Sequence, residues 1–213
     1  GAIGIVTADS GTAGVSGYVV MSTGASVKGN SGAMYVGSGT SASGRGGSIY
    51  VTVGSGNSGS GGDVVLMAGT SSGTTGGQIY LSAGTSSVTT GGRILIQSGF
   101  SSAKSSGAIG IRTADSSTSG VSGYLIMSSG VGNKGNSGSL WVGSGASTSG
   151  RGGSVYVTVG SGDSGTGGDV VITGGGASDA AVGDAAGGQI YMSAGTSAAQ
   201  TGGRIFIRSG VST

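Results

Sequence analysis

The sequence predicts an all-β fold: a parallel β-solenoid of about fourteen coils with a thin, flat core. Three observations support this prediction. The chain repeats itself with a short period, each repeat holds one stretch of alternating apolar residues, and glycine makes up 54 of the 213 residues. Alternation with a period of two residues is typical of a strand, and no segment shows the 3.6-residue period of a helix.

The repeat has two levels. The pentapeptide GAIGI begins at Gly1 and again at Gly107, so the large period is 106 residues. Most short units are 15 residues long, units 1 and 8 have one residue more, and unit 12 has five more. The units, numbered 1 to 14 from here on, begin at Gly1, Gly17, Gly32, Gly47, Gly62, Gly77, Gly92, Gly107, Gly123, Gly138, Gly153, Gly168, Gly188 and Gly203. We therefore expect two continuous domains, 1–106 and 107–213, each a seven-coil solenoid repeat.

Each unit has the same design. Position 1 is glycine, positions 3 and 5 are apolar, as in Ile79 and Leu81, and a tract rich in Gly, Ser and Thr follows. We expect coils to stack at about 4.8 Å, so that positions 3 and 5 form continuous inward ladders. The glycines at position 1 are expected to occupy turns. The small residues of the tracts would let two sheet layers approach closely, which predicts a core that is thin and flat.

Position 4 is apolar as well, although it faces away from positions 3 and 5 in a strand. This column forms an assembly stripe of Tyr35, Tyr50, Tyr80, Leu95, Ile126, Trp141, Tyr156, Tyr191 and Phe206. An exposed apolar strip of more than a few hundred Å² usually marks an interface, so we expect another sheet to pack here. Two interpretations stay open beside this one: a general preference of strands for Tyr and Val on either face, and a face that binds sugars or surfaces.

Position 2 shares the face of the stripe, and three consecutive units in each large repeat carry Asp, Gln and Arg there. These residues form a polar ladder of Asp63, Gln78, Arg93, Asp169, Gln189 and Arg204. Stacked coils would join them by hydrogen bonds and ion pairs. Charged residues at this position indicate that the face starts out accessible to solvent.

The composition excludes several kinds of chemistry. The chain has no cysteine and no histidine, which removes disulfides, thiolate metal sites and the commonest general base. The serines lack a histidine partner, and the aspartates show no paired arrangement. The stretch GSGNSGSGGD matches the calcium-binding nonapeptide poorly. We expect no enzyme, no cofactor and no bound metal.

The charge and hydropathy patterns limit the partners. A net charge of +2 gives no signal for nucleic acid. No apolar run approaches the roughly 18 residues that a membrane span needs. The terminal units lack polar caps, so we expect either a piece of a longer array or coils that stack head to tail. Both arrangements give a filament.

These features predict a structural protein of the extracellular space or cell surface, which self-assembles as a homopolymer into a filament, sheath or appendage. The alternative is a binding module, either for ice or as a carbohydrate-binding adhesin stalk with a surface or polysaccharide as its partner. The units, of the form GGxIxLxxGxSSxxxG, resemble long Gly/Ser-rich repeat proteins of algae and related microbes, and the solenoid stalks of bacterial adhesins. The resemblance covers the whole chain and implies a β-solenoid in an extracellular fibre or stalk. It transfers no functional residue.

Overall fold

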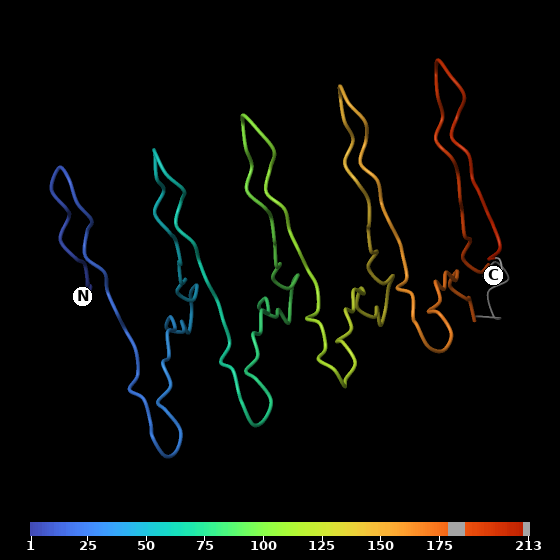
Figure 1. Ribbon diagram of the computed structural model, residues 1–213. Coiled ribbons are helices and arrows are strands. Elements are labelled where there is room, and N and C mark those ends of the chain that lie inside the picture. The colour runs from blue at the N-terminus through green and yellow to red at the C-terminus, as the bar shows by residue number, and fades with distance from the viewer. Residues whose placement is uncertain (179–185, 211–213) are drawn as a thin grey trace. The chain divides into compact units, whose positions relative to one another are not determined.

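The computed structural model describes residues 1–178 and 186–210. Within these ranges the chain forms no helix and no strand, and Figure 1 shows it as a plain trace without coils or arrows. The predicted parallel β-solenoid is therefore wrong. The chain instead forms a series of narrow loops, which are joined by short linking segments at positions 2 to 6 of each unit (Figure 1).

The predicted core is also wrong for the described residues. Ile79 is 53% exposed and Leu81 is 69% exposed, although they represent the two columns that were expected to face inward. The least exposed large apolar side chains are Val53 and Val159, at 45% each. Alternation of apolar residues favours an extended backbone, but a sheet also requires backbone hydrogen bonds between neighbouring segments. Here the backbone hydrogen bonds instead join position 8 of one unit to the first glycine of the next unit.

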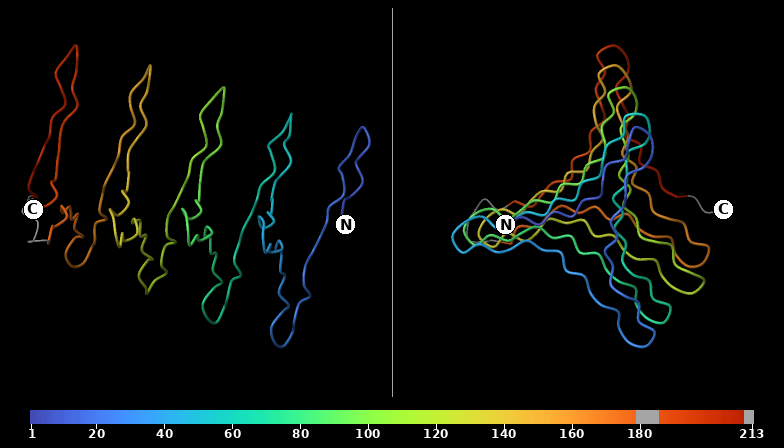
Figure 2. Two further views of the ribbon diagram at one scale, coloured as in Figure 1. Left: turned by 180° about the vertical axis from the view of Figure 1, so that it is seen from behind. Right: turned by 90° about the vertical axis from the view of Figure 1, so that its left-hand side faces the viewer.

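The 15-residue period reappears as regularly spaced loop tips. The chain bends sharply at 12–14, 27–29, 42–44, 57–59, 72–74, 87–89, 102–104, 118–120, 133–135, 148–150, 163–165 and 198–200. Both views in Figure 2 show that the two arms of a loop run side by side up to its tip. The repeat of the sequence is thus a repeat of loops rather than of solenoid coils.

A backbone hydrogen bond closes the base of many loops, and we call it the neck bond. The glycine that opens a unit donates its N–H to the carbonyl oxygen of the glycine at position 8 of the preceding unit. The bond is 2.8 Å from Gly77 to Gly69 and 2.8 Å from Gly92 to Gly84. The remaining neck bonds run from Gly47 to Gly39, Gly107 to Gly99, Gly153 to Gly145, Gly188 to Gly175 and Gly203 to Gly195.

Position 7 contributes a second contact at the neck. Where it is Thr or Ser, its hydroxyl donates in several units to the carbonyl of the glycine that opens the next unit. The distance is 3.0 Å from Thr23 to Gly32 and 2.8 Å from Ser38 to Gly47. The same bond forms from Thr7 to Gly17, Thr113 to Gly123 and Ser144 to Gly153.

This close approach explains the opening glycine of most units. A Cβ at Gly92 would lie 3.1 Å from the Cβ of Ala83 and 3.1 Å from the backbone nitrogen of Gly84. A positive φ angle is found only at Gly14, Gly29 and Gly165 within the described residues, and all three lie in loop bends. The position-1 glycines are therefore sites of close packing across the neck, and the prediction that they occupy turns is wrong.

Serine at position 10 shapes several loop tips. The Ser86 Oγ accepts the N–H of Thr89 at 3.0 Å and the N–H of Val88 at 3.3 Å. Ser71, Ser101 and Ser197 accept the N–H three residues further on in the same way. Such local bonds from a side chain to the backbone favour a turn over a strand.

The chain divides into two parts, Gly1–Ala108 and Ile109–Thr213. The boundary lies beside the junction of the two large sequence repeats at Gly107. Each part is built from the same loops and linking segments, so its local structure follows from that of a single unit.

Candidate assembly surface

The assembly stripe is fully open to solvent in the structure. Its members are between 72% exposed, at Ile126, and 93% exposed, at Tyr35. Trp141, the largest of them, is 92% exposed. Nine of the linking segments carry a stripe residue at position 4, between apolar residues at positions 3 and 5.

One hydrogen bond joins the stripe to the polar ladder. The Tyr80 hydroxyl donates to the side-chain amide oxygen of Gln78. Residues 78 and 80 can meet in this way only when their side chains leave the backbone on the same side. Positions 2 and 4 of unit 6 therefore share a face, as alternation along an extended segment requires.

The rest of the polar ladder lies on separate linking segments. Asp63, Arg93, Asp169, Gln189 and Arg204 are all exposed. In the part of the chain that the structure describes, no hydrogen bond connects one ladder residue to the next. The order Asp, Gln, Arg is thus a feature of the sequence, and in the described residues no hydrogen bond links its members.

The accessible area shows how little of the chain is buried. The chain exposes 21299 Å² for a mass of 19.6 kDa. A compact protein of this mass exposes about 8,600 Å², and a fully unfolded chain about 28,000 Å². The chain therefore buries only about a third of the surface that a compact fold of its size would bury.

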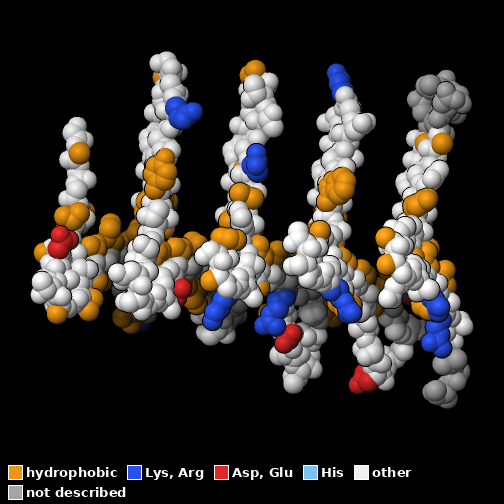
Figure 3. Space-filling model, turned by 90° about the horizontal axis from the view of Figure 1, so that it is seen from above, with side chains coloured by type: hydrophobic (Ala, Val, Ile, Leu, Met, Phe, Trp, Pro, Cys, Tyr) orange, Lys and Arg blue, Asp and Glu red, His pale blue; other side chains and the backbone are white. Residues whose placement is uncertain are grey.

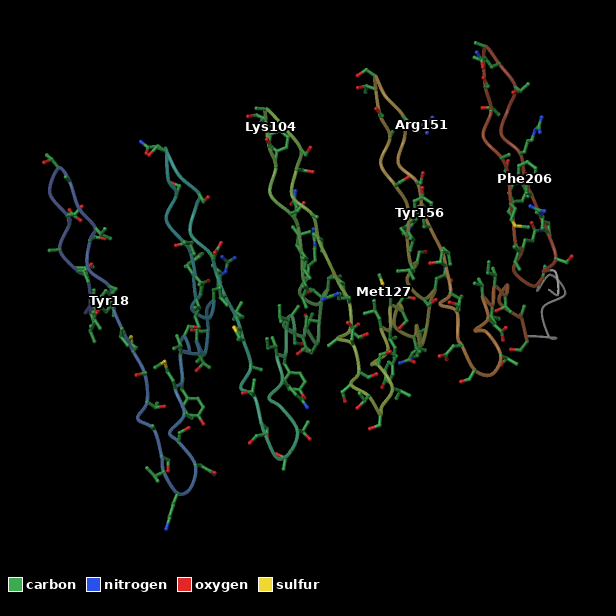
Figure 4. All side chains as sticks on the ribbon, viewed as in Figure 1. Tyr18, Lys104, Met127, Arg151, Tyr156 and Phe206 are labelled. Atoms are coloured by element: carbon green, nitrogen blue, oxygen red, sulfur yellow. The ribbon has the colours of Figure 1, made fainter. Side chains whose placement is uncertain are left out.

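Apolar and polar residues occupy different places. Figure 3 shows hydrophobic side chains gathered near the bases of the loops, while the sequence of the loops is mostly Gly, Ser and Thr. The basic residues Lys104 and Arg151 lie near loop tips, whereas Met127 and Tyr156 lie towards the bases (Figure 4). The linking segments therefore hold most of the apolar surface.

Sequence reasoning missed the neck residues at position 7. Ala68, Ala83, Ser98, Thr113 and Ala194 all occupy this position, and they are among the few described residues that are half-buried. The signal was available, because position 7 is a small or β-branched residue in every unit while position 1 of the next unit is always glycine. A small residue paired at fixed spacing with glycine indicates close backbone approach.

Searches for other kinds of site gave simple results. The described residues form no pocket and no cluster of three or more carboxylates that could hold a metal ion. Among them there is also no helix with the length and hydropathy to cross a bilayer.

No protein-family model, no curated protein and no solved structure matches the chain.

Proposed function

We propose that this chain is a structural protein, not an enzyme, that assembles with copies of itself into a filament, sheath or surface appendage outside the cell. The exposure of its apolar residues carries the proposal. Every Val, Ile, Leu, Met, Phe, Tyr and Trp among the described residues is at least 45% exposed. Soluble monomers rarely expose contiguous apolar patches beyond a few hundred Å², and larger ones mark interaction sites.

The periodicity of the apolar residues supports a copy of the chain as the partner. Nine of the fourteen linking segments present an aromatic or aliphatic stripe residue at position 4. A partner that covers such a surface must offer apolar groups at the same spacing. A second copy of the chain meets this requirement over its whole length, and repeated surfaces of this kind are typical of repeat proteins.

The magnitudes also favour association. Burial of one large apolar side chain stabilises by about 1.5–3 kcal/mol. Burial of the whole stripe would contribute on the order of 15–25 kcal/mol. Lost translational and rotational freedom costs about 4–15 kcal/mol. The gain is comparable to this cost, and burial of positions 3 and 5 would add to it.

An extracellular location belongs to the same proposal. It is supported by a chain that is rich in Gly, Ser and Thr and contains only 8% charged residues. Small, weakly charged residues suit a material in which many copies pack closely.

Concentration-dependent light scattering together with negative-stain electron microscopy of the full chain tests the proposal. We expect elongated assemblies whose amount rises steeply with protein concentration at neutral pH. Monomers alone, at every concentration up to the solubility limit, would overturn it.

A further inference from the structure

The linking segment of unit 6, residues 78–82, has backbone groups without partners. In the described part of the chain, no hydrogen bond involves a backbone N–H or C=O of these residues, because the adjacent neck bonds use Gly77 and Gly84. The hydrogen bond from the Tyr80 hydroxyl to the Gln78 side chain shows that this segment is extended. An extended segment with free N–H and C=O groups along its edges is a template for a second strand.

The composition of the same segment indicates what kind of strand can pair with it. Ile79, Tyr80 and Leu81 are all exposed, and Ile and Tyr are among the residues that strands favour. The segment contains no glycine, no proline and no charged residue. Short segments with these properties pair with identical segments of other chains, because every backbone group and every side chain then meets its own counterpart.

The distribution of charge singles out unit 6. It lies within the longest run of the chain that has no charged side chain, residues 64–92, and Asp63 and Arg93 border this run. Both occupy position 2 of their units, where unit 6 has Gln78. In a parallel, in-register stack, Asp63 would face Asp63 and Arg93 would face Arg93, which is destabilising. Stacked glutamines instead form a hydrogen-bonded ladder. The bordering charges therefore confine such pairing to unit 6.

The necks on either side of unit 6 are both closed. In the described part of the chain, only the linking segments of units 6, 7 and 13 lie between two neck bonds. Unit 7 carries Arg93, but unit 13 has the sequence GQIYMSA, which differs from GQIYLSA of unit 6 at one position. A segment that is already held at both ends loses less freedom when it binds. The neck bonds and the charges thus point independently to the same two units.

We propose that the linking segment of unit 6 pairs, parallel and in register, with the same segment of a second copy of the chain, and that unit 13 pairs in the same way. Each segment has two edges, so every copy binds one copy above and one below, and the assembly grows in one direction. An antiparallel pair centred on Tyr80 would set Gln78 against Ser82 and lose the glutamine ladder. The inference rests on the proposed function, since it names the contact through which copies assemble.

Removal of a bordering charge is expected to strengthen assembly. In the full chain, Arg93→Gln gives unit 7 an uncharged linking segment between two closed necks, so we expect the critical concentration for assembly at low salt to fall about fivefold. The matched control is Lys104→Gln, which changes the net charge equally near a loop tip and is expected to change little. An equal fall in both variants would show that net charge alone controls assembly, and would overturn the role assigned to Arg93.

Introduction of a charge is expected to weaken assembly. The double variant Gln78→Arg, Gln189→Arg gives units 6 and 13 the position-2 residue of unit 7, and we expect the critical concentration to rise about fivefold or more. The double variant Gln78→Asn, Gln189→Asn keeps the side-chain amides and is expected to assemble like the unmodified chain. Light scattering across a dilution series measures both. No difference between the arginine and asparagine variants would overturn the proposed pairing.

Spin labelling tests the register, because the chain has no cysteine of its own. Chains with Ser82→Cys carry a nitroxide label, and parallel, in-register pairing sets these labels about 4.8 Å apart along the backbone. We expect strong spin exchange in the assembly and its loss when labelled chains are diluted with unlabelled ones. A label at Ser87→Cys, in the loop of the same unit, is expected to show none. Absence of exchange at residue 82 would overturn the parallel register.

Fibre diffraction separates this inference from the proposed function. We expect a reflection at about 4.8 Å along the axis of aligned assemblies. Assemblies without this reflection would overturn the strand pairing and leave the proposed function standing. Failure of the unmodified chain to assemble at any concentration would overturn the proposed function itself.

Discussion

The loops and the linking segments differ in how their side chains and backbone groups find partners. The loops join their polar groups by hydrogen bonds, whereas the linking segments leave their apolar side chains exposed to solvent. In a loop such as residues 84–92, the neck bond from Gly92 to Gly84 and the bonds to the Ser86 hydroxyl join polar groups within a few residues of each other. In the linking segment that precedes it, Ile79, Tyr80 and Leu81 are 53%, 85% and 69% exposed and have no apolar cover.

This difference indicates that the sequences of the two regions have different roles. Local hydrogen bonds specify the loops, so a loop depends only on one unit and the glycine that follows it. The apolar pattern of the linking segments has no use within one unit, because nothing in the same unit covers it. We infer that the loops encode the conformation of the chain, while the linking segments encode its association.

The largest expected effect comes from the linking segments. Replacing three stripe residues, with Tyr80→Ser, Trp141→Ser and Tyr191→Ser in one chain, removes about 1.5–3 kcal/mol of burial at each position. We expect association to weaken on the order of a thousandfold, since 1.4 kcal/mol corresponds to a factor of ten. Light scattering across a dilution series measures the change.

A matched control uses apolar residues that are equally exposed but lie in the loops. Val88 is 90% exposed, Phe100 is 89% exposed and Val131 is 92% exposed. The triple variant Val88→Ser, Phe100→Ser, Val131→Ser is expected to associate like the unmodified chain. An equal loss in both triple variants would show that general hydrophobicity, and not the stripe, drives association.

A smaller effect is expected at the neck. Gly92→Ala places a methyl group 3.1 Å from both Ala83 and the nitrogen of Gly84, and overpacking of this kind costs about 1–3 kcal/mol. Gly84→Ala meets nothing within 4 Å, and such a replacement stabilises by about 0.4–1 kcal/mol. Hydrogen exchange at the amide of residue 92 should therefore accelerate in the first variant and slow in the second. The same response in both would contradict the close approach.

The smallest effect is expected at the loop tip. Ser86→Ala removes the acceptor of the Thr89 and Val88 N–H groups, at a cost of about 0.5–1.5 kcal/mol. We expect a larger temperature coefficient for the Thr89 amide in nuclear magnetic resonance spectra. Ser87→Ala, one residue further along the same tip, serves as the control, and a comparable change there would show that the Ser86 hydroxyl has no special role.

Part of this structure could be predicted from sequence because it is local. The spacing of the position-1 glycines gives the spacing of the loops, and Ser86 or Ser71 followed three residues later by Thr is a recognisable turn pattern. In unit 6 the hydrogen bond between Tyr80 and Gln78 agrees with alternation, which places positions 2 and 4 on the same side of an extended segment.

The solenoid could not be predicted reliably, for a physical reason. Alternation at Ile79 and Leu81 indicates an extended segment but carries no information about which segment pairs with it. Pairing between units requires ordering a glycine-rich chain, and glycine loses more conformational freedom than any other residue. The local bonds at Gly84, Ser86 and Gly92 form at lower entropic cost, because they close short loops.

The neck of unit 12 shows that a loop can be longer while its base keeps the same hydrogen bond. This unit has five more residues than its neighbours, yet the Gly188 N–H still donates to the Gly175 carbonyl at 2.8 Å. In unit 12 the glycines at these two positions close the base of the loop although five more residues lie between them. Natural variation and protein engineering can therefore use the loops as insertion points: a foreign peptide placed beyond the neck would be displayed at regular intervals while the spacing of the linking segments stays unchanged.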